Sequence, residues 1–502
     1  MHQVRTSSYV IYVPVGPTAD GKDTLLVHGY TGAYDRVSDN VVRFLKKREA
    51  KRDKPLYGEW VKDAHADDTP EAEISSVTHD TLRRRGYLTE LSVEQEEEVF
   101  KRFAGILHRK NSGYPSYIVM PTYDCNLRCS YCFQDHMRTN PLNRHLLRVM
   151  SRDMVDRMFL GMEEIERRHG VDTETFVRQF TLFGGEPLLA GSKDTISYIV
   201  EKAKKRGEAN FMAISNATEL DAYPELLGPE GISGLQITLD GPPDEHDKRR
   251  IYPDGKGSFE KIAQNITMAL GRGASVSVRI NLDRNNIRDV PRLAHVLKER
   301  GWTSHPNFSV YSAPIHAANE KTSRKTTFNS WELDQELTRM RVSDEDLVRI
   351  QRPDDRIVAA ARRIFAKGPS EQLPNYKESF CSAHTGMYIF DSFGDIYACW
   401  ERTGDPSIRI GHVSHDGTVT LNTPELSQWR ERTVASNTVC SKCRYGLQCG
   451  GGCAVLAATA NGAYNTNYCD GFASRFKASV SEAYKDHIAG RSMVMADRVC
   501  DQ

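Results

Sequence analysis

The chain has 502 residues, a length that accommodates about three domains, and 39% of the residues are hydrophobic, which is enough for large packed cores. Its 67 basic and 67 acidic residues cancel, which argues against a broad electrostatic surface for nucleic acid or an anionic membrane. No run of about eighteen apolar residues occurs, and the short apolar run 9–15 contains a proline, so we expect neither a membrane span nor a secretory signal. We therefore expect a cytoplasmic protein without nucleic-acid or membrane partners.

The first 112 residues contain no cysteine and predict a small module of strands and helices. Apolar runs at 9–13 and 25–30 flank glycine-containing turn residues and predict a hairpin. Helical patterns follow at 38–52, 78–85 and 93–107. We expect residues 1–112 to form a separate domain.

Residues 113–313 alternate between strand-like and helix-like patterns. Such alternation predicts an α/β fold with a parallel sheet, either open or closed into a partial barrel. Functional residues of these folds gather where the strands end. The predicted strands are 117–120, 180–183, 211–215, 235–239, 275–281 and 308–310, and the predicted helices include 144–168, 196–205, 259–270 and 290–300.

The remaining chain predicts three further regions. Residues 314–380 are polar and mixed, as expected of helices that bridge two domains. Residues 381–470 hold seven of the 11 cysteines, with many glycines and little periodicity. The tail, 471–502, begins with a helical pattern. In a chain of this size, clustered cysteines are typical of metal ligands or catalytic groups in a reducing compartment.

The first cysteine group is Cys125, Cys129 and Cys132, directly after the first predicted strand of the sheet. A closed zinc site or an ordinary electron-transfer cluster takes four protein ligands. Three thiolates on a cubane cluster leave one iron open, and a ligand can bind there. A zinc knuckle and a chance triplet are the alternatives.

The spacing Cys-x3-Cys-x2-Cys, with Tyr131 before the last cysteine, resembles the radical S-adenosylmethionine (SAM) superfamily. The resemblance implies a partial (β/α)6 TIM-like barrel and a 4Fe-4S cluster whose open iron binds SAM. In that family, one electron from the cluster cleaves SAM to methionine and a 5′-deoxyadenosyl radical, which abstracts a substrate hydrogen. Tyr131 would pack near the adenine.

Further motifs of the family follow the predicted strands in order. A glycine pair and a glutamate after the second predicted strand resemble the GGE motif, which binds the ammonium group of SAM. Polar residues at the ends of later strands match the family's contacts to the ribose and the carboxylate of SAM. Each of these residues also has an ordinary alternative as a turn or loop cap. The residues carried over as cofactor contacts are Gly184, Gly185, Glu186, Ser215, Asn216, Thr238 and Arg279, with Asn281 beside the last of them.

The seven later cysteines resemble the SPASM extension of radical SAM enzymes at every spacing. The resemblance implies two auxiliary 4Fe-4S clusters, three clusters in all. Sulfatase maturases have one more cysteine where this chain has Met387, so one auxiliary cluster is expected to have an open iron. Nearby His384 is expected to be a surface residue, and Cys500 a free tail thiol. The implied ligand sets are Cys440, Cys443, Cys449 and Cys469 for one cluster, and Cys381, Cys399 and Cys453 for the other.

Zinc is the alternative for this extension, since Cys-x2-Cys pairs suit zinc ribbons. Two closed zinc sites need four ligands each, and seven cysteines do not supply eight without a histidine.

The SPASM resemblance also implies a peptide substrate. The first 112 residues resemble, in the order of their elements, the winged-helix-like PqqD-type domains that hold the leader of a ribosomally made precursor peptide. A leader would add a strand to the hairpin edge. The basic residues 46–48 would favour an acidic leader or form an ordinary solvated helix face. The family also implies an electron donor such as flavodoxin or ferredoxin.

Three functions remain open at this point. The first is a radical SAM peptide maturase (an oxidoreductase) that forms a thioether, carbon–carbon or carbon–oxygen cross-link or another oxidised residue. The second is an anaerobic sulfatase-maturing enzyme, which forms formylglycine. That family has an aspartate where this chain has Trp400, and Glu401 on an extended chain would point to the opposite face. The third is a non-catalytic iron–sulfur scaffold that binds peptides. No residue stands out as the catalytic acid or base.

Overall fold

The structure is a computed structural model that describes residues 4–18, 20–50, 72–316, 322–323, 325–367 and 374–490. Cys500 and the end of the predicted helix 38–52 lie outside these residues. Within the described ranges, no helix combines the length and the apolar composition that crossing a bilayer requires.

Internal contacts divide the chain into two compact units. We call residues 111–353 and 382–430 the barrel unit, and residues 1–110, 354–381 and 431–502 the terminal unit. The division separates 382–430 from 431–470, which the predicted domain boundaries keep together. The reason is that strands from 382–430 join the large sheet described next.

The barrel unit contains one eleven-stranded sheet, in which the six predicted strands lie side by side in sequence order. Neighbouring strands are parallel from β12 to β13, and antiparallel from β13 to β16. The predicted α/β fold with a parallel sheet is thus confirmed. The order is β12 (Ile350–Gln351), β11 (Phe308–Pro314), β10 (Ser275–Leu282), β9 (Ile232–Thr238), β8 (Ala209–Ser215), β7 (Arg178–Leu182), β6 (Ser116–Val119), β13 (Met387–Phe390), β14 (Asp395–Tyr397), β15 (Arg409–Val413) and β16 (Val419–Leu421).

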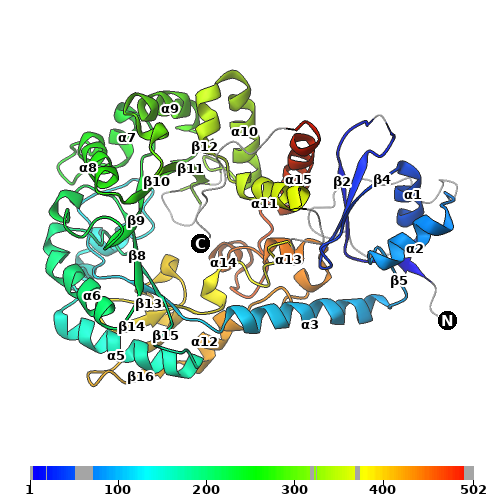
Figure 1. The fold of residues 1–502 in the computed structure, drawn as a ribbon. Coiled ribbons are helices and arrows are strands. Elements are labelled where there is room, and N and C mark those ends of the chain that lie inside the picture. The colour runs from blue at the N-terminus through cyan, green and yellow to red at the C-terminus, as the bar shows by residue number, and fades with distance from the viewer. Residues whose placement is uncertain are drawn as a thin grey trace. The chain divides into compact units, whose positions relative to one another are not determined.

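Helices between the strands cover one face of this sheet (Figure 1). All but the shortest of them bury an apolar stripe and expose charged residues, as the 3.6-residue period requires. They are α5 (Arg152–His169), α6 (Lys193–Lys205), α7 (Pro243–Arg249), α8 (Phe259–Gly271) and α9 (Val290–Glu299).

The predicted helix 144–168 is wrong over its first eight residues. A 3₁₀ turn spans Pro141–Leu147, and α5 begins at Arg152. The Ser151 hydroxyl accepts a hydrogen bond from the Met154 amide at 3.1 Å, so Ser151 caps α5.

Strands β13 to β16 are absent from the sequence-based expectation for 381–470. β13 is buried over its whole length and pairs in parallel with β6. A strand buried on both faces is a continuous apolar run and does not alternate, so its four residues do not stand out in a glycine-rich region.

The terminal unit contains a three-stranded antiparallel sheet in the order β2-β3-β4, with β2 (Val10–Pro14), β3 (Thr24–His28) and β4 (Tyr34–Val37). β2 and β3 match the predicted hairpin, and β4 is an additional strand. A hydrophobic core lies between this sheet and the helices at 355–367 and 472–488, with Ile11, Val27 and Val480 among its buried residues. The helices of the unit include α1 (Asp39–Lys47), α2 (Ser76–Arg84), α3 (Val93–Asn111), α11 (Asp355–Lys367) and α15 (Phe472–Ile488).

Candidate functional site

The loop after β6 carries Cys125, Cys129 and Cys132, and its backbone is tied to a segment more than a hundred residues away. The Arg128 amide donates to the Ile251 carbonyl at 2.7 Å, and the Ser130 amide donates to the Arg249 carbonyl at 3.1 Å. A loop held on both sides can present its three sulfurs in a fixed arrangement. We call residues 125–132 the three-cysteine loop.

The three cysteines of this loop are half-buried, and positive charge lies beside their sulfurs. Burial raises the pKa of the Cys125 thiol to about 12 and that of Cys129 to about 11, and the guanidinium groups of Arg138 and Arg250 oppose these rises. Arg138 also donates to the Cys132 sulfur at 3.0 Å. Bound iron stabilises thiolates that burial alone disfavours, so the donor set fits an iron–sulfur cluster.

Among the described residues, no three Cys, His, Asp or Glu side chains lie close enough to hold one metal ion. A cubane cluster has no such requirement, because each cysteine binds a different iron atom.

Tyr131 anchors the loop to the ends of two strands. Its hydroxyl donates to the Asp240 carboxylate and accepts hydrogen bonds from Arg250 at 2.8 Å and from Asn281 at 3.1 Å. Asp240 follows β9, and Asn281 lies near the end of β10. The sequence interpretation did not single out Arg250, although it directly follows the charged run 246–249.

The loop after β7 passes so close to the three-cysteine loop that two residues must be glycine. Gly184 has a φ of +141°, and a Cβ there would lie 2.4 Å from the Thr122 carbonyl oxygen. A Cβ on Gly185 would lie 2.2 Å from the Asp124 carbonyl oxygen. The amides of Gly185 and Glu186 donate to these same two carbonyls, at 3.1 Å and 2.7 Å respectively.

The buried Glu186 carboxylate connects three of the predicted contact residues. It accepts hydrogen bonds from the Ser215 hydroxyl at 2.8 Å and from the Asn216 amide. Burial raises the pKa of Glu186 to about 7. Asn216 in turn donates to the Cys125 sulfur at 3.6 Å, so the end of β8 reaches the three-cysteine loop.

Thr238 and Arg279 are register partners at the ends of β9 and β10, and both are half-buried. Arg279 donates to the Asn281 side chain at 2.8 Å. The structure therefore brings the predicted contact residues to one end of the sheet, beside the three-cysteine loop. Their roles toward SAM remain predictions.

Residues 398–405 also lie against this end of the sheet. The sequence interpretation did not predict this contact. The Trp400 ring packs on Phe183 at 5.6 Å between centroids, and Gln134 donates to the Thr403 hydroxyl at 3.3 Å. Trp400–Arg402 form a 3₁₀ turn, so the expectation that Glu401 points away on an extended chain is wrong. Burial raises the pKa of Glu401, and the charge of Arg279 opposes that rise.

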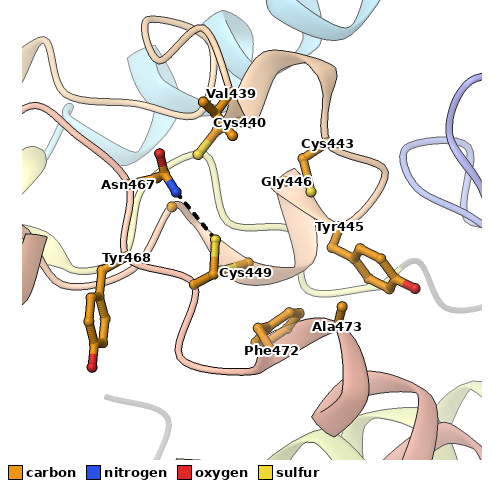
Figure 2. A pocket seen from close by; sticks show the side chains of 12 residues that line it. Val439, Cys440, Cys443, Tyr445, Gly446, Cys449, Asn467, Tyr468, Phe472 and Ala473 are labelled. Atoms are coloured by element: carbon orange, nitrogen blue, oxygen red, sulfur yellow. Dashed lines mark hydrogen bonds between the residues drawn. The ribbon is translucent and has the colours of Figure 1, made fainter. Parts of the chain in front are cut away.

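In the terminal unit, Cys440, Cys443, Cys449 and Cys469 line one pocket, which holds about 460 Å³ of atom-free space that includes open solvent. We call it the four-cysteine pocket (Figure 2). Burial raises the pKa of the Cys440 thiol, and it raises that of Cys449 to about 11. This is the set that the SPASM resemblance assigns to one complete cluster.

A buried cation lies beside these sulfurs. Arg432 is 5% exposed and donates to the Tyr464 and Thr466 carbonyls, each at 2.7 Å. The sulfurs of Cys440 and Cys453 interact electrostatically with its guanidinium. A buried guanidinium requires nearby negative charge, which cluster-bound thiolates supply.

The second predicted auxiliary set remains a prediction, because Cys399 belongs to the barrel unit while Cys381 and Cys453 belong to the terminal unit. Met387, at the position of the missing cysteine, is the first residue of β13, and its sulfur accepts a hydrogen bond from Ser382 at 3.5 Å.

The expectation of a surface location for His384 is wrong. His384 is fully buried, its ring stacks on Trp429 at 5.7 Å, and its Nδ1 pairs with the Trp429 carbonyl oxygen at 2.9 Å. The apolar ring face is covered and a ring nitrogen has a partner, so burial leaves no unpaired polar group at that nitrogen.

Sequence comparison finds a domain and several relatives. Residues 119–329 match the model of the radical SAM superfamily. The chain is 24% identical over 394 residues to a cysteine-type anaerobic sulfatase-maturating enzyme of Clostridium novyi (strain NT), which covers 72% of this chain and 96% of the relative. It is 25% identical over 189 residues to a GTP 3′,8-cyclase of Sinorhizobium medicae (strain WSM419), 36% of this chain and 48% of that relative.

Two solved structures share the fold. One is native anSMEcpe with bound AdoMet, with a TM-score of 0.55 and 17% identity, covering 75% of this chain and 100% of that one. The other is native anSMEcpe with bound AdoMet and the Cp18Cys peptide, with a TM-score of 0.52, the same 17% identity and the same coverage, 75% and 100%.

Proposed function

We propose that this chain is a peptide maturase that oxidises a residue of a ribosomally made precursor. Its residues 119–329 form a radical SAM domain, and domains of this family bind a 4Fe-4S cluster and SAM. The observation that carries the proposal is the three-cysteine loop, whose sulfurs lie against the strand ends where the candidate SAM contacts meet. The relative that was solved with a bound peptide supports a peptide substrate.

In this proposal, Cys125, Cys129 and Cys132 hold the cluster and leave one iron for SAM. When bound, the reduced cluster and SAM supply a 5′-deoxyadenosyl radical, which removes a hydrogen atom from the substrate. The two glycines 184 and 185 let backbone approach the ligand closely. Arg138 holds positive charge at Cys132, and the buried Tyr131–Asp240 pair keeps the loop in place and limits the access of water.

The remaining cysteines serve the second half of the oxidation. Cys440, Cys443, Cys449 and Cys469 would hold one auxiliary cluster, and the set Cys381, Cys399 and Cys453 stays a prediction from the SPASM resemblance. A cluster held by these cysteines would supply an acceptor for the second electron of the oxidation, and a base would take the proton. The net loss of two hydrogen atoms forms a cross-link or another oxidised residue.

The first 112 residues bind the leader of the precursor as a PqqD-like domain. Three antiparallel strands followed by three helices support this assignment. Because the sheet order is β2-β3-β4, the edge strands are β2 and β4, and an extended leader would pair with one of them. In the same proposal, 113–313 form the radical core, 314–380 the bridge, 381–470 the SPASM domain and 471–502 the tail.

Formylglycine formation is the second candidate, supported by the match that spans 96% of the Clostridium relative. The absence of an aspartate at Trp400 counts against it. The 3₁₀ turn weakens that objection, because Glu401 provides a buried carboxyl group one position later.

One experiment tests both candidates. The protein is reconstituted anaerobically with iron and sulfide, reduced with dithionite and given SAM with either a precursor peptide encoded beside its gene or a sulfatase peptide that contains cysteine. We expect 5′-deoxyadenosine in both reactions and, in the first, a peptide that has lost two hydrogen atoms. An aldehyde on the sulfatase peptide would favour the second candidate. Colourless protein that contains only zinc and does not cleave SAM would contradict both.

A further inference from the structure

A basic segment follows the three-cysteine loop. Residues 136–149 include three arginines and two histidines but no acidic residue, although 67 of the 502 residues in the chain are acidic. These residues cover α4 (Asp135–Thr139) apart from Asp135, and the 3₁₀ turn Pro141–Leu147. We call residues 136–149 the basic segment.

The outer side of the basic segment combines exposed charge with exposed apolar surface. Arg144 and Arg148 are both exposed. Leu142 is 81% exposed and Val149 is 38% exposed. Exposed leucines are common singly, but Leu142 lies within a few residues of exposed arginines, a residue type that is enriched at protein interfaces.

Neighbouring carboxylates do not neutralise these two arginines. Within the described ranges, no ion pair includes Arg144 or Arg148, whereas Arg152 pairs with Asp194. Arg148 is held in place differently, because it donates to the Ser392 carbonyl at 2.8 Å and lies over the Phe393 ring at 3.9 Å. Arg144 therefore presents its charge to solvent, while the exposed side chain of Arg148 rests against Ser392 and Phe393.

The inner side of the basic segment contacts the three-cysteine loop and the residues that precede it. Arg138 donates to the Cys132 sulfur at 3.0 Å and to the Tyr123 carbonyl at 3.2 Å. The Leu147 carbonyl accepts from the Thr122 hydroxyl at 3.3 Å. The same short segment therefore carries the exposed arginines and contacts the sulfur of Cys132.

We propose that the basic segment is the docking surface for an acidic one-electron donor protein. The inference rests on the proposed function, since the cluster must gain one electron from outside the chain before the first SAM molecule is cleaved. In the step, the reduced centre of the donor loses one electron and the cluster gains it, and no proton or group is transferred. Charge complementarity brings the acidic donor to this face, and Leu142 contacts it.

The test compares two ways of supplying the electron. The double substitution Arg144→Glu with Arg148→Glu reverses the charge, and Leu142→Ala is a milder second variant. The matched control is Arg102→Glu with Arg109→Glu, two exposed arginines of α3. For each protein, the rate of 5′-deoxyadenosine formation is measured against the concentration of reduced flavodoxin and, separately, with dithionite. Binding of flavodoxin is measured without SAM.

We expect the charge-reversed variant to need about tenfold more flavodoxin for half its maximal rate at low salt, and Leu142→Ala to need several-fold more. Rates with dithionite stay at the wild-type level, and added salt weakens flavodoxin binding more in the wild type than in the charge-reversed protein. The control double variant behaves as wild type.

Unchanged flavodoxin dependence in both variants would overturn the proposal. Equal loss with dithionite would also overturn it, because the segment would then support the cluster loop itself. So would equally tight binding of an acidic protein that has no redox centre. If wild-type protein does not cleave SAM even with dithionite, the proposed function fails, while the binding measurement still tests the docking surface.

Discussion

The three-cysteine loop and the four-cysteine pocket differ in what surrounds their sulfurs. The loop uses three sulfurs within eight residues, and polar groups from several strand ends converge on it, including Glu186, Asn216 and Asp240. The pocket collects four sulfurs from a longer stretch of chain, and apolar residues such as Phe472 and Ala473 complete its lining. Polar groups beside an incomplete ligand set are suited to binding a charged cofactor, whereas a complete set of four cysteines is suited to holding a closed cluster.

The largest expected effect comes from removing one ligand of the loop. Cys129→Ala should reduce 5′-deoxyadenosine formation to the level of a reaction without enzyme, because a cluster with two protein ligands no longer binds stably or presents one open iron. Chromatography of the products after reduction with dithionite measures this. Cys500→Ala, a change in the tail thiol, is the control and should retain wild-type activity. Cleavage of SAM by the Cys129 variant would contradict the assignment of the loop.

Removing one cysteine of the four-cysteine pocket should stop modification of the peptide but not the cleavage of SAM. Cys440→Ala is expected to cleave SAM at a rate within about tenfold of wild type, since sites that share no partners act nearly independently. The modified peptide should be absent in mass spectra, because the electron released by the substrate radical has no acceptor. Iron analysis should show a loss confined to one cluster. Normal amounts of modified peptide would show that the pocket has no part in the oxidation.

A smaller effect is expected from the cation at the pocket. Arg432→Gln removes a buried positive charge beside the sulfurs, so the reduced state of the cluster loses stabilisation and its midpoint potential falls. Loss of the hydrogen bonds to two carbonyls should also cost about 1–3 kcal/mol of unfolding free energy. Redox titration monitored by electron paramagnetic resonance distinguishes the two effects. Arg432→Lys keeps the charge and should retain most of the potential even if it is equally destabilised.

The smallest effect concerns a brace of the three-cysteine loop. The hydroxyl of Tyr123, two residues before Cys125, donates to the buried Asp391 carboxylate at 2.9 Å. Burial, together with the charge of Asp395, raises the pKa of Asp391 from its ordinary 3.8 to about 6. Between these two pH values the folded protein keeps a proton that the unfolded chain has lost, so this group stabilises the fold at low pH, and the contribution declines as pH rises through about 6.

Asp391→Asn removes that dependence, because the amide does not titrate. The stability of the variant relative to wild type should therefore be greater at pH 7 than at pH 5, by about 1 kcal/mol. Thermal unfolding at both pH values, under anaerobic conditions, measures the difference. A pH dependence identical to that of wild type would show that Asp391 is ionised in the folded protein across this range.

What the sequence determined by itself is local. Period and composition were sufficient for the six parallel strands β6 to β11, and cysteine spacing was sufficient to identify the two cysteine groups, because both patterns lie within short stretches of chain. The glycine pair 184–185 directly follows a predicted strand, so its position was also evident from the sequence. The structure shows that these glycines pass close to the carbonyls of Thr122 and Asp124.

Only the tertiary structure decided which distant residues meet. β13 adds to β6 across more than two hundred residues, and its partner is set by the sheet edge that β6 leaves open. Arg250 and Arg432 are buried beside cysteine sulfurs and interact with them electrostatically. His384 is buried with its ring stacked on Trp429. Burial and electrostatic environment depend on packing between segments far apart in the chain, and no local pattern of residue types records that packing.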